Sequence, residues 1–293
     1  MTRSGGASIG GALRQGAARL VRAPAVLAGT ILLAALFTVP PAPAARAALW
    51  LHAGDVWSIW LLGYGPMVPG AWDYVPAPWA DGAELLRGLV FWSLLSGGVL
   101  DRYARDRPTR GRGFFAACGA HAPAMFRLAL VALALNATFN LWLYPRVEYS
   151  RGLFVAVTAV LFGISVTVTY AQVRMVIEDR RSALGALLAA ARFARRNPAA
   201  LALHALLVAT AWAVKFALVG VLSRSDEFSM AGVGAAEGLI VVQYLLILLS
   251  WAAAVVLFQS RLAHASYTAG SALAWPESPA AEAIANGAQR LPR

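Results

Sequence analysis

Long apolar stretches recur along the chain, and arginines flank most of them. The hydrocarbon core of a bilayer is about 30 Å thick, and a helix of about 20 apolar residues crosses it while satisfying its own backbone hydrogen bonds. Six stretches meet this requirement, at about residues 23–45, 81–100, 128–145, 152–172, 198–222 and 238–260. The pattern predicts an all-α polytopic membrane helix bundle. Its single six-span domain covers residues 1–268, and a disordered cytoplasmic tail follows at 269–293.

The distribution of arginine predicts the orientation of these spans. Lys and Arg accumulate in the cytoplasmic loops of membrane proteins. With six spans, nineteen arginines fall on one side, and five fall on the other, namely Arg46, Arg87, Arg146, Arg151 and Arg224. Both termini are therefore expected in the cytoplasm. This topology also explains the net charge of +11 without a nucleic-acid partner, because the arginines are dispersed over several segments.

Two other topologies compete with six spans. The first span resembles a signal peptide with a cleavage site at Ala42-Pro43-Ala44. A seventh span through ALWLHAGDVWSIWLL is disfavoured, because it would move the richest arginine clusters outside.

The chain uses arginine almost to the exclusion of lysine and is rich in alanine. This composition is typical of a GC-rich bacterial genome, so a bacterial inner membrane is the expected location.

A faint internal repeat precedes three of the spans. The segments GALRQGAARLVRAP, at 11–24, and GALLAAARFARRNP, at 185–198, match in register, and RGRGFFAACGAHAP, at 110–123, is a looser copy. The inferred unit is a short basic helix, a proline, a span, an outer loop and a returning span. Proline is expected to break or bend the helix where the chain turns to cross the membrane.

The repeated basic helices predict contacts with lipid. Around the helix at 181–196, arginines occupy one arc, opposite an apolar arc that contains Ala186 and Ala190. Such an amphipathic helix lies in the membrane interface, with its arginines toward anionic headgroups. The alternative is an anchor for topology with no further role. The candidate headgroup contacts are Arg181, Arg192, Arg195, Arg196, Arg105, Arg110 and Arg112.

An aromatic segment is predicted on the outer side, at residues 46–80. It holds half of the ten tryptophans, namely Trp50, Trp57, Trp60, Trp72 and Trp79. Indole rings favour the headgroup level, so an interfacial cap is the simpler interpretation. The more specific interpretation is a docking surface for a partner or a lid over a binding site.

Few polar residues interrupt the spans. Lys215 and His204 are 11 residues apart in the fifth span and so share about one face, and Asn136 and Asn140 lie in the third. These four residues could line a cavity, because charged groups inside a membrane are functional hypotheses by default. The alternative is hydrogen bonding between packed helices, for the histidine and the amides above all.

Motifs of known chemistry are absent from the sequence. No P-loop, HExxH or GxSxG is present, Cys118 is the only cysteine, and the four histidines are scattered. We therefore expect no catalytic residue, no metal and no cofactor. An intramembrane enzyme using Asp101, Asp106, Glu178 or Asp179 is a third possibility; the alternative for these acids is ion pairing, with Arg174 and Glu178 at i, i+4 spacing.

Two stretches carry a family resemblance: LLSGGVLDRYARDRPTRGRGFFAACGAH and VRMVIEDRRSALGALLAAARFARRNP. They resemble bacterial six-span membrane proteins of unknown function, in which a Gly-Gly-x-Leu-Asp turn precedes a Phe-Phe helix. The arrangement of predicted spans is also similar to that of the membrane domain attached to some bacterial glycerophosphodiester phosphodiesterases. The resemblance implies six spans, and it implies no particular activity because none is assigned to the group.

These features predict a non-enzymatic accessory or scaffold subunit of the membrane. Its expected partners are anionic lipid headgroups and another membrane protein, because its distinctive residues lie at the interfaces and not in the interior. The alternative is a transporter or lipid-handling permease with a polar cavity near Lys215 and His204.

Overall fold

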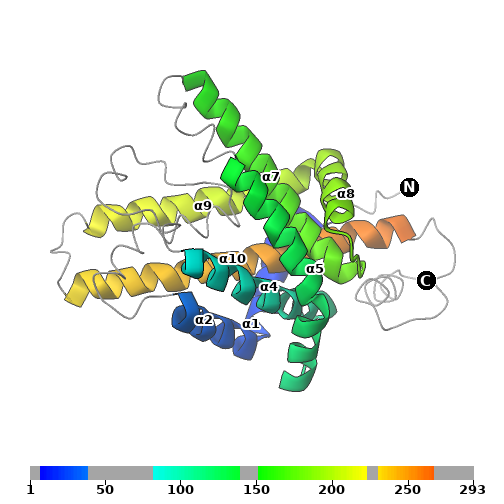
Figure 1. Ribbon diagram of the computed structural model, residues 1–293, viewed down its shortest axis with the longest axis horizontal. Helices are drawn as coiled ribbons and strands as arrows, with labels where there is room; N and C mark the ends of the chain where they lie inside the picture. The colour runs from blue at the N-terminus through cyan, green and yellow to red at the C-terminus, as the bar shows by residue number, and fades with distance from the viewer. Residues whose placement is uncertain (1–6, 39–81, 139–150, 223–229, 267–293) are drawn as a thin grey trace.

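The structure is a computed structural model that describes residues 7–38, 82–138, 151–222 and 230–266. All regular secondary structure in these ranges is helical (Figure 1). The helices are α1 (Ile9–Val21), α2 (Pro24–Thr38), α4 (Gly82–Arg105), α5 (Gly111–Thr138), α7 (Arg151–Ile177), α8 (Ala183–Arg196), α9 (Pro198–Leu222) and α10 (Met230–Ser266). The all-α prediction is confirmed for this part of the chain.

Apolar helices long enough to cross a membrane are present among the described residues. Three stretches qualify by themselves, at Gly111–Leu135, Thr158–Ile177 and Tyr244–Leu262. The number rises to five if each of two bent helix pairs forms one span. Helix α4 covers the second predicted span but is not among these candidates. The structure thus has the character of a membrane protein, and the count of six spans stays a prediction.

The two bent pairs correspond to the best-matched copies of the sequence repeat. Helices α1 and α2 meet at 80°, and α8 and α9 meet at 97°, with Pro24 and Pro198 directly after the bends. Each short helix begins with a serine cap, because Ser8 Oγ accepts from the Gly11 amide at 3.1 Å and Ser182 Oγ accepts from the Gly185 amide at 3.2 Å. The bends at Pro24 and Pro198 therefore occur where the sequence predicts them.

The buried positions of α1 and α8 also match in register. Ala12, Gly16 and Leu20 are buried in α1. The aligned residues of α8 are buried too, namely Ala186, Ala190 and Ala194. Capping, burial and bend therefore agree between two segments that share only a few identical residues.

The third copy departs from the pattern. Helix α5 continues through Pro123, so of the two outcomes expected there, a break or a bend, the break does not occur. Helix α4 packs closely along α5 on the N-terminal side of this proline: a Cβ atom on Gly98 would lie 2.3 Å from Cys118 Sγ, and one on Gly97 would lie 2.6 Å from His121 Cβ. The glycine pair therefore lies inside α4 and not in a turn.

Helix α10 forms the centre of the core. Every residue from Trp251 to Gln259 is buried, as expected of a helix that has neighbours on all sides. Trp251 contacts Trp92 of α4 edge to face at 5.7 Å, and Phe258 contacts Phe193 of α8 at 5.0 Å. Helix α9 runs beside α10 along the long axis of the molecule (Figure 1).

The N-terminal helices belong to this core. A Cβ atom on Gly16 of α1 would lie 2.8 Å from the backbone nitrogen of Ala253 in α10. Leu20 and Ala23 are buried as well. Cleavage at the signal-peptide-like site would remove these contacts, and the choice between a retained and a cleaved first span stays a prediction.

The close contact of α1 with α10 generates a prediction. Replacing Gly16 by alanine places a methyl group against the α10 backbone, and we expect the free energy of unfolding to fall by about 1–3 kcal/mol. Gly10→Ala in the same helix is the matched control, since its Cβ would meet nothing within 4 Å. Thermal unfolding of both variants in detergent checks this, and equal effects would contradict the packing.

Candidate functional site

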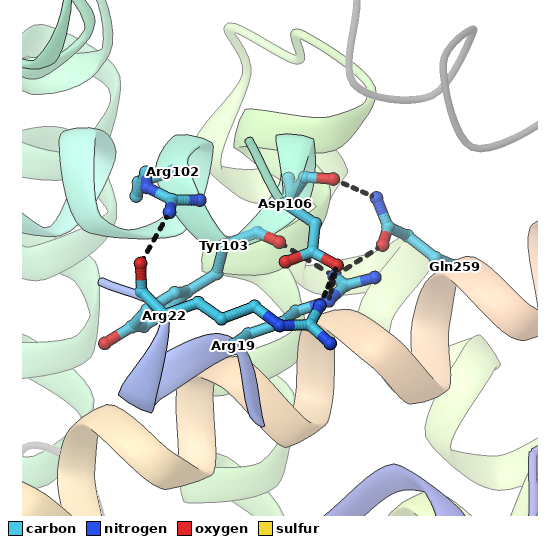
Figure 2. A network of polar contacts seen from close by, with 7 residues as sticks. Arg19, Arg22, Arg102, Tyr103, Asp106 and Gln259 are labelled. Atoms are coloured by element: carbon cyan, nitrogen blue, oxygen red, sulfur yellow. Dashed lines mark hydrogen bonds and ion pairs between the residues drawn. The ribbon is translucent and has the colours of Figure 1, made fainter. Parts of the chain in front are cut away.

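A network of polar contacts joins the C-terminal ends of α1, α4 and α10 (Figure 2). Arg19 Nη1 of α1 donates to the Tyr103 carbonyl oxygen at 2.7 Å and to Gln259 Oε1 at 2.8 Å. Gln259 Nε2 donates in turn to the Ala104 carbonyl oxygen at 2.8 Å. Two side chains therefore tie three helices together, and both bond carbonyl groups in the last turn of α4.

Asp106 supplies the negative charge of this network. It follows α4 directly and has a φ of 47°, in the left-handed region that aspartate tolerates better than most residues. Its Oδ2 lies 3.3 Å from Arg22 Nη1 and 3.7 Å from Arg19 Nε. The turn after α4 thereby aims a carboxylate at two arginines of α1.

Arg102 is the most buried arginine of the network, with 5% of its surface exposed. Its Nη2 donates to the Arg22 carbonyl oxygen at 3.1 Å, at the end of α1 (Figure 2). Among the described residues, no acceptor lies within hydrogen-bonding distance of its Nη1. Burial raises the pKa of the neighbouring Tyr103 hydroxyl, partly opposed by the charge of Arg102, so Tyr103 stays neutral.

A second cluster joins α7, α8 and α10. Arg174 donates to Glu178 through Nη2 at 2.8 Å and through Nε at 3.2 Å, which confirms the predicted i, i+4 pair. Arg174 Nη1 also donates to the Ala189 carbonyl oxygen at 3.0 Å, and its guanidinium lies 5.4 Å from the Phe258 ring centroid. Glu178 accepts a further bond from Arg180. Asp179, with a φ of 49°, repeats the backbone conformation of Asp106.

The arginines predicted to contact headgroups fall into two groups. Arg105 is half-buried and bonds both carboxylate oxygens of Asp101, at 2.9 and 3.0 Å, so it has a partner inside the protein. The others have exposed side chains, namely Arg110, Arg112, Arg181, Arg192, Arg195 and Arg196. The apolar face of α8 lies against the protein, mainly α7, and not against lipid as an isolated amphipathic helix would place it.

The predicted cavity can be described only at His204. This residue is 4% exposed, its Nε2 lies 2.9 Å from Ser165 Oγ of α7, and Phe162 meets its ring edge to face. The geometry is that of a hydrogen bond between packed helices. The side chains of Lys215 and Asn136 lie outside the described part of the structure, as do Asn140 and the whole outer segment with Trp50, Trp57, Trp60, Trp72 and Trp79.

Three of the four acids considered as possible catalysts have arginine partners, and Asp179 is exposed. Asp101 binds Arg105, Asp106 lies near Arg19 and Arg22, and Glu178 binds Arg174 and Arg180. Within the described ranges no three His, Cys, Asp or Glu residues come close enough to hold a metal ion. The clusters can fix helix ends and attract anions; no nucleophile and base come together in them.

Sequence reasoning overlooked the residues that build the main network. Arg19, Arg22 and Arg102 were counted only as topology signals, and Gln259 was not noticed. One signal could have found Gln259, because an amide directly after an apolar run of eight residues, Trp251 to Phe258, needs a hydrogen-bond partner. Its partner Arg19 lies 240 residues away in sequence, which no local pattern reveals.

Comparisons with known proteins add no assignment. No protein-family model matches the chain, and no curated protein or solved structure matches it. The function of the clusters therefore has to be argued from their own chemistry.

Arg19 provides a test of the network. Replacing it by methionine keeps most of the side-chain volume but leaves Gln259 and the Tyr103 carbonyl without a donor, and we expect a loss of about 2–3 kcal/mol in the free energy of unfolding. Arg14→Met is the control, because Arg14 is exposed on the same helix and should change stability by about 0.5 kcal/mol or less. Denaturant unfolding of both variants measures the difference; similar losses would refute a special role for Arg19.

Proposed function

We propose that the protein is a non-enzymatic accessory or scaffold subunit of a bacterial inner membrane, which holds a membrane partner and anionic lipids through its arginine-bearing surface. The single observation that carries the proposal is the pair of nearly perpendicular bends at Pro24 and Pro198. A helix at right angles to a membrane-crossing helix lies along the membrane surface, where headgroups are the nearest ligands.

Helix α8 illustrates how this surface would work. Its alanine face is buried against the protein. Its outer face presents Leu184 and Leu188, which are 63% and 61% exposed, followed by the exposed Arg192 and Arg195. The spacing of three and four residues puts these side chains on one side of the helix. Leucine can enter the acyl boundary while arginine contacts phosphate, a combination that suits an anionic bilayer.

The internal placement of the acids supports a structural role over catalysis. Asp101 and Glu178 each bond an arginine four residues away in sequence, and Asp106 reaches across to α1. Groups committed to ion pairs fix helix ends and are poorly placed for proton transfer. The permease alternative gains no support from His204, because this residue is already bonded to Ser165 and packed on Phe162.

Gentle native purification followed by mass spectrometry of bound proteins and lipids tests the proposal. We expect a stoichiometric membrane-protein partner together with enriched anionic lipid. Each surface arginine contributes about 1 kcal/mol to headgroup attraction, so changing Arg192, Arg195 and Arg196 to glutamine should weaken anionic lipid retention about a hundredfold. The corresponding triple lysine variant keeps the charge and is the matched control.

A different set of results would remove the proposal. A monomer without a protein partner, whose deletion disturbs no membrane complex, would exclude the scaffold. Equal lipid retention by the glutamine and lysine variants would exclude the arginine surface. A specific bound solute in place of a partner would favour the permease.

A further inference from the structure

The bend between α1 and α2 carries a feature that the proposed function does not use. Arg102 of α4 is 5% exposed and reaches the Arg22 carbonyl oxygen, two residues before α2 begins at Pro24. Its Nη1 has no hydrogen-bond acceptor in the described part of the chain. The nearby carboxylates are engaged by other arginines, Asp101 by Arg105 and Asp106 by Arg22. A buried guanidinium with a free donor and no carboxylate of its own favours an anion beside it.

The first turn of α2 begins two residues after the Arg22 carbonyl group that Arg102 bonds, and it adds further donors. Pro24 has no N–H, and the Leu27 amide donates to the Ala23 carbonyl oxygen at 3.0 Å. The amides of Ala25 and Val26 are therefore the first-turn donors that have no acceptor within the helix. Pro24 and Ala25 are exposed, so a ligand can reach this turn from outside. The N-terminus of a helix of 15 residues also brings a partial positive charge.

The α8–α9 bend shows that the repeat alone does not produce this arrangement. Asn197 stands there at the position of Ala23, and its Nδ2 donates to the Phe193 carbonyl oxygen at 2.9 Å. The end of α8 is thus capped by a residue of its own segment, whereas the end of α1 is capped by an arginine from a different helix. Arg102 is a feature specific to the first bend.

We propose that the α1–α2 bend is a binding site for a phosphate-class anion, held by the Arg102 guanidinium and the first-turn amides of α2. Guanidinium and helix N-terminal amides are both common phosphate ligands. Two sources supply this chemistry: the headgroup of an anionic phospholipid and free inorganic phosphate. The membrane-surface position of the bend rests on the proposed function, but the site itself lies apart from the α8 arginines.

Three variants of the full-length chain test the site. Arg102→Gln removes the guanidinium. Ala25→Pro removes one first-turn amide at a position where a helix tolerates proline, and so tests the site even if Arg102→Gln fails to fold. Ala199→Pro makes the same change at the matched position of α9 and is the control. Binding is measured as the rise in Tm on adding phosphatidylglycerol, phosphatidylcholine or inorganic phosphate to the detergent-purified protein.

We expect phosphatidylglycerol to raise the Tm of the wild type and of Ala199→Pro. Ala25→Pro and Arg102→Gln should each bind it about tenfold more weakly, the loss typical of one charge-assisted hydrogen bond. The same pattern with inorganic phosphate alone would support the site and identify the free anion as the ligand. Unchanged binding in Ala25→Pro, or equal losses in Ala25→Pro and Ala199→Pro, would overturn the site. Retention of a protein partner is measured separately, so failure of the scaffold proposal can be distinguished from failure of the anion site.

Discussion

The contact of α1 with α10 is the constraint on which the rest of the structure depends. Gly16 brings the two backbones so close that Arg19, one turn later, can reach both Gln259 and the Tyr103 carbonyl. With a larger residue at position 16, α1 would move outward, and the half-buried guanidinium would lose two acceptors. The same close approach of α1 to α10 places Asp106 beside Arg22 and Arg102 beside the bend between α1 and α2.

The helices themselves were largely predictable. Hydropathy placed the fifth span at the residues that α9 occupies, and it placed the fourth within a few residues of α7 at its N-terminal end. Apolar runs are local features, and so are the proline and serine signals that define the bends. Pro123 is the exception, because α5 continues through it where the local signal predicts a break or a bend, and α4 packs against the turns before it through Gly97 and Gly98.

The candidate site was less predictable for a physical reason. Arg174 and Glu178 could be paired from the sequence because one turn of helix separates them. Arg19, Asp106 and Gln259 come from three helices, and only the crossing of these helices brings them together. A count of arginines gives orientation and cannot distinguish Arg192, which is exposed, from Arg102, which is buried. Partly for that reason the arginines predicted to contact headgroups divide into an exposed group and Arg105, which is paired inside the protein.

The separation of Arg19 and Gln259 in the chain also bears on biosynthesis. The two residues are 240 positions apart, so at a synthesis rate of about 5–20 residues per second Gln259 emerges roughly 10 to 50 s after Arg19. During this interval the face of α1 that bears Ala12, Gly16 and Leu20 has no α10 to cover it. Helix α1 is therefore made well before the helix that packs on it, and something else must shield its buried face in the meantime, either lipid or the membrane insertion machinery.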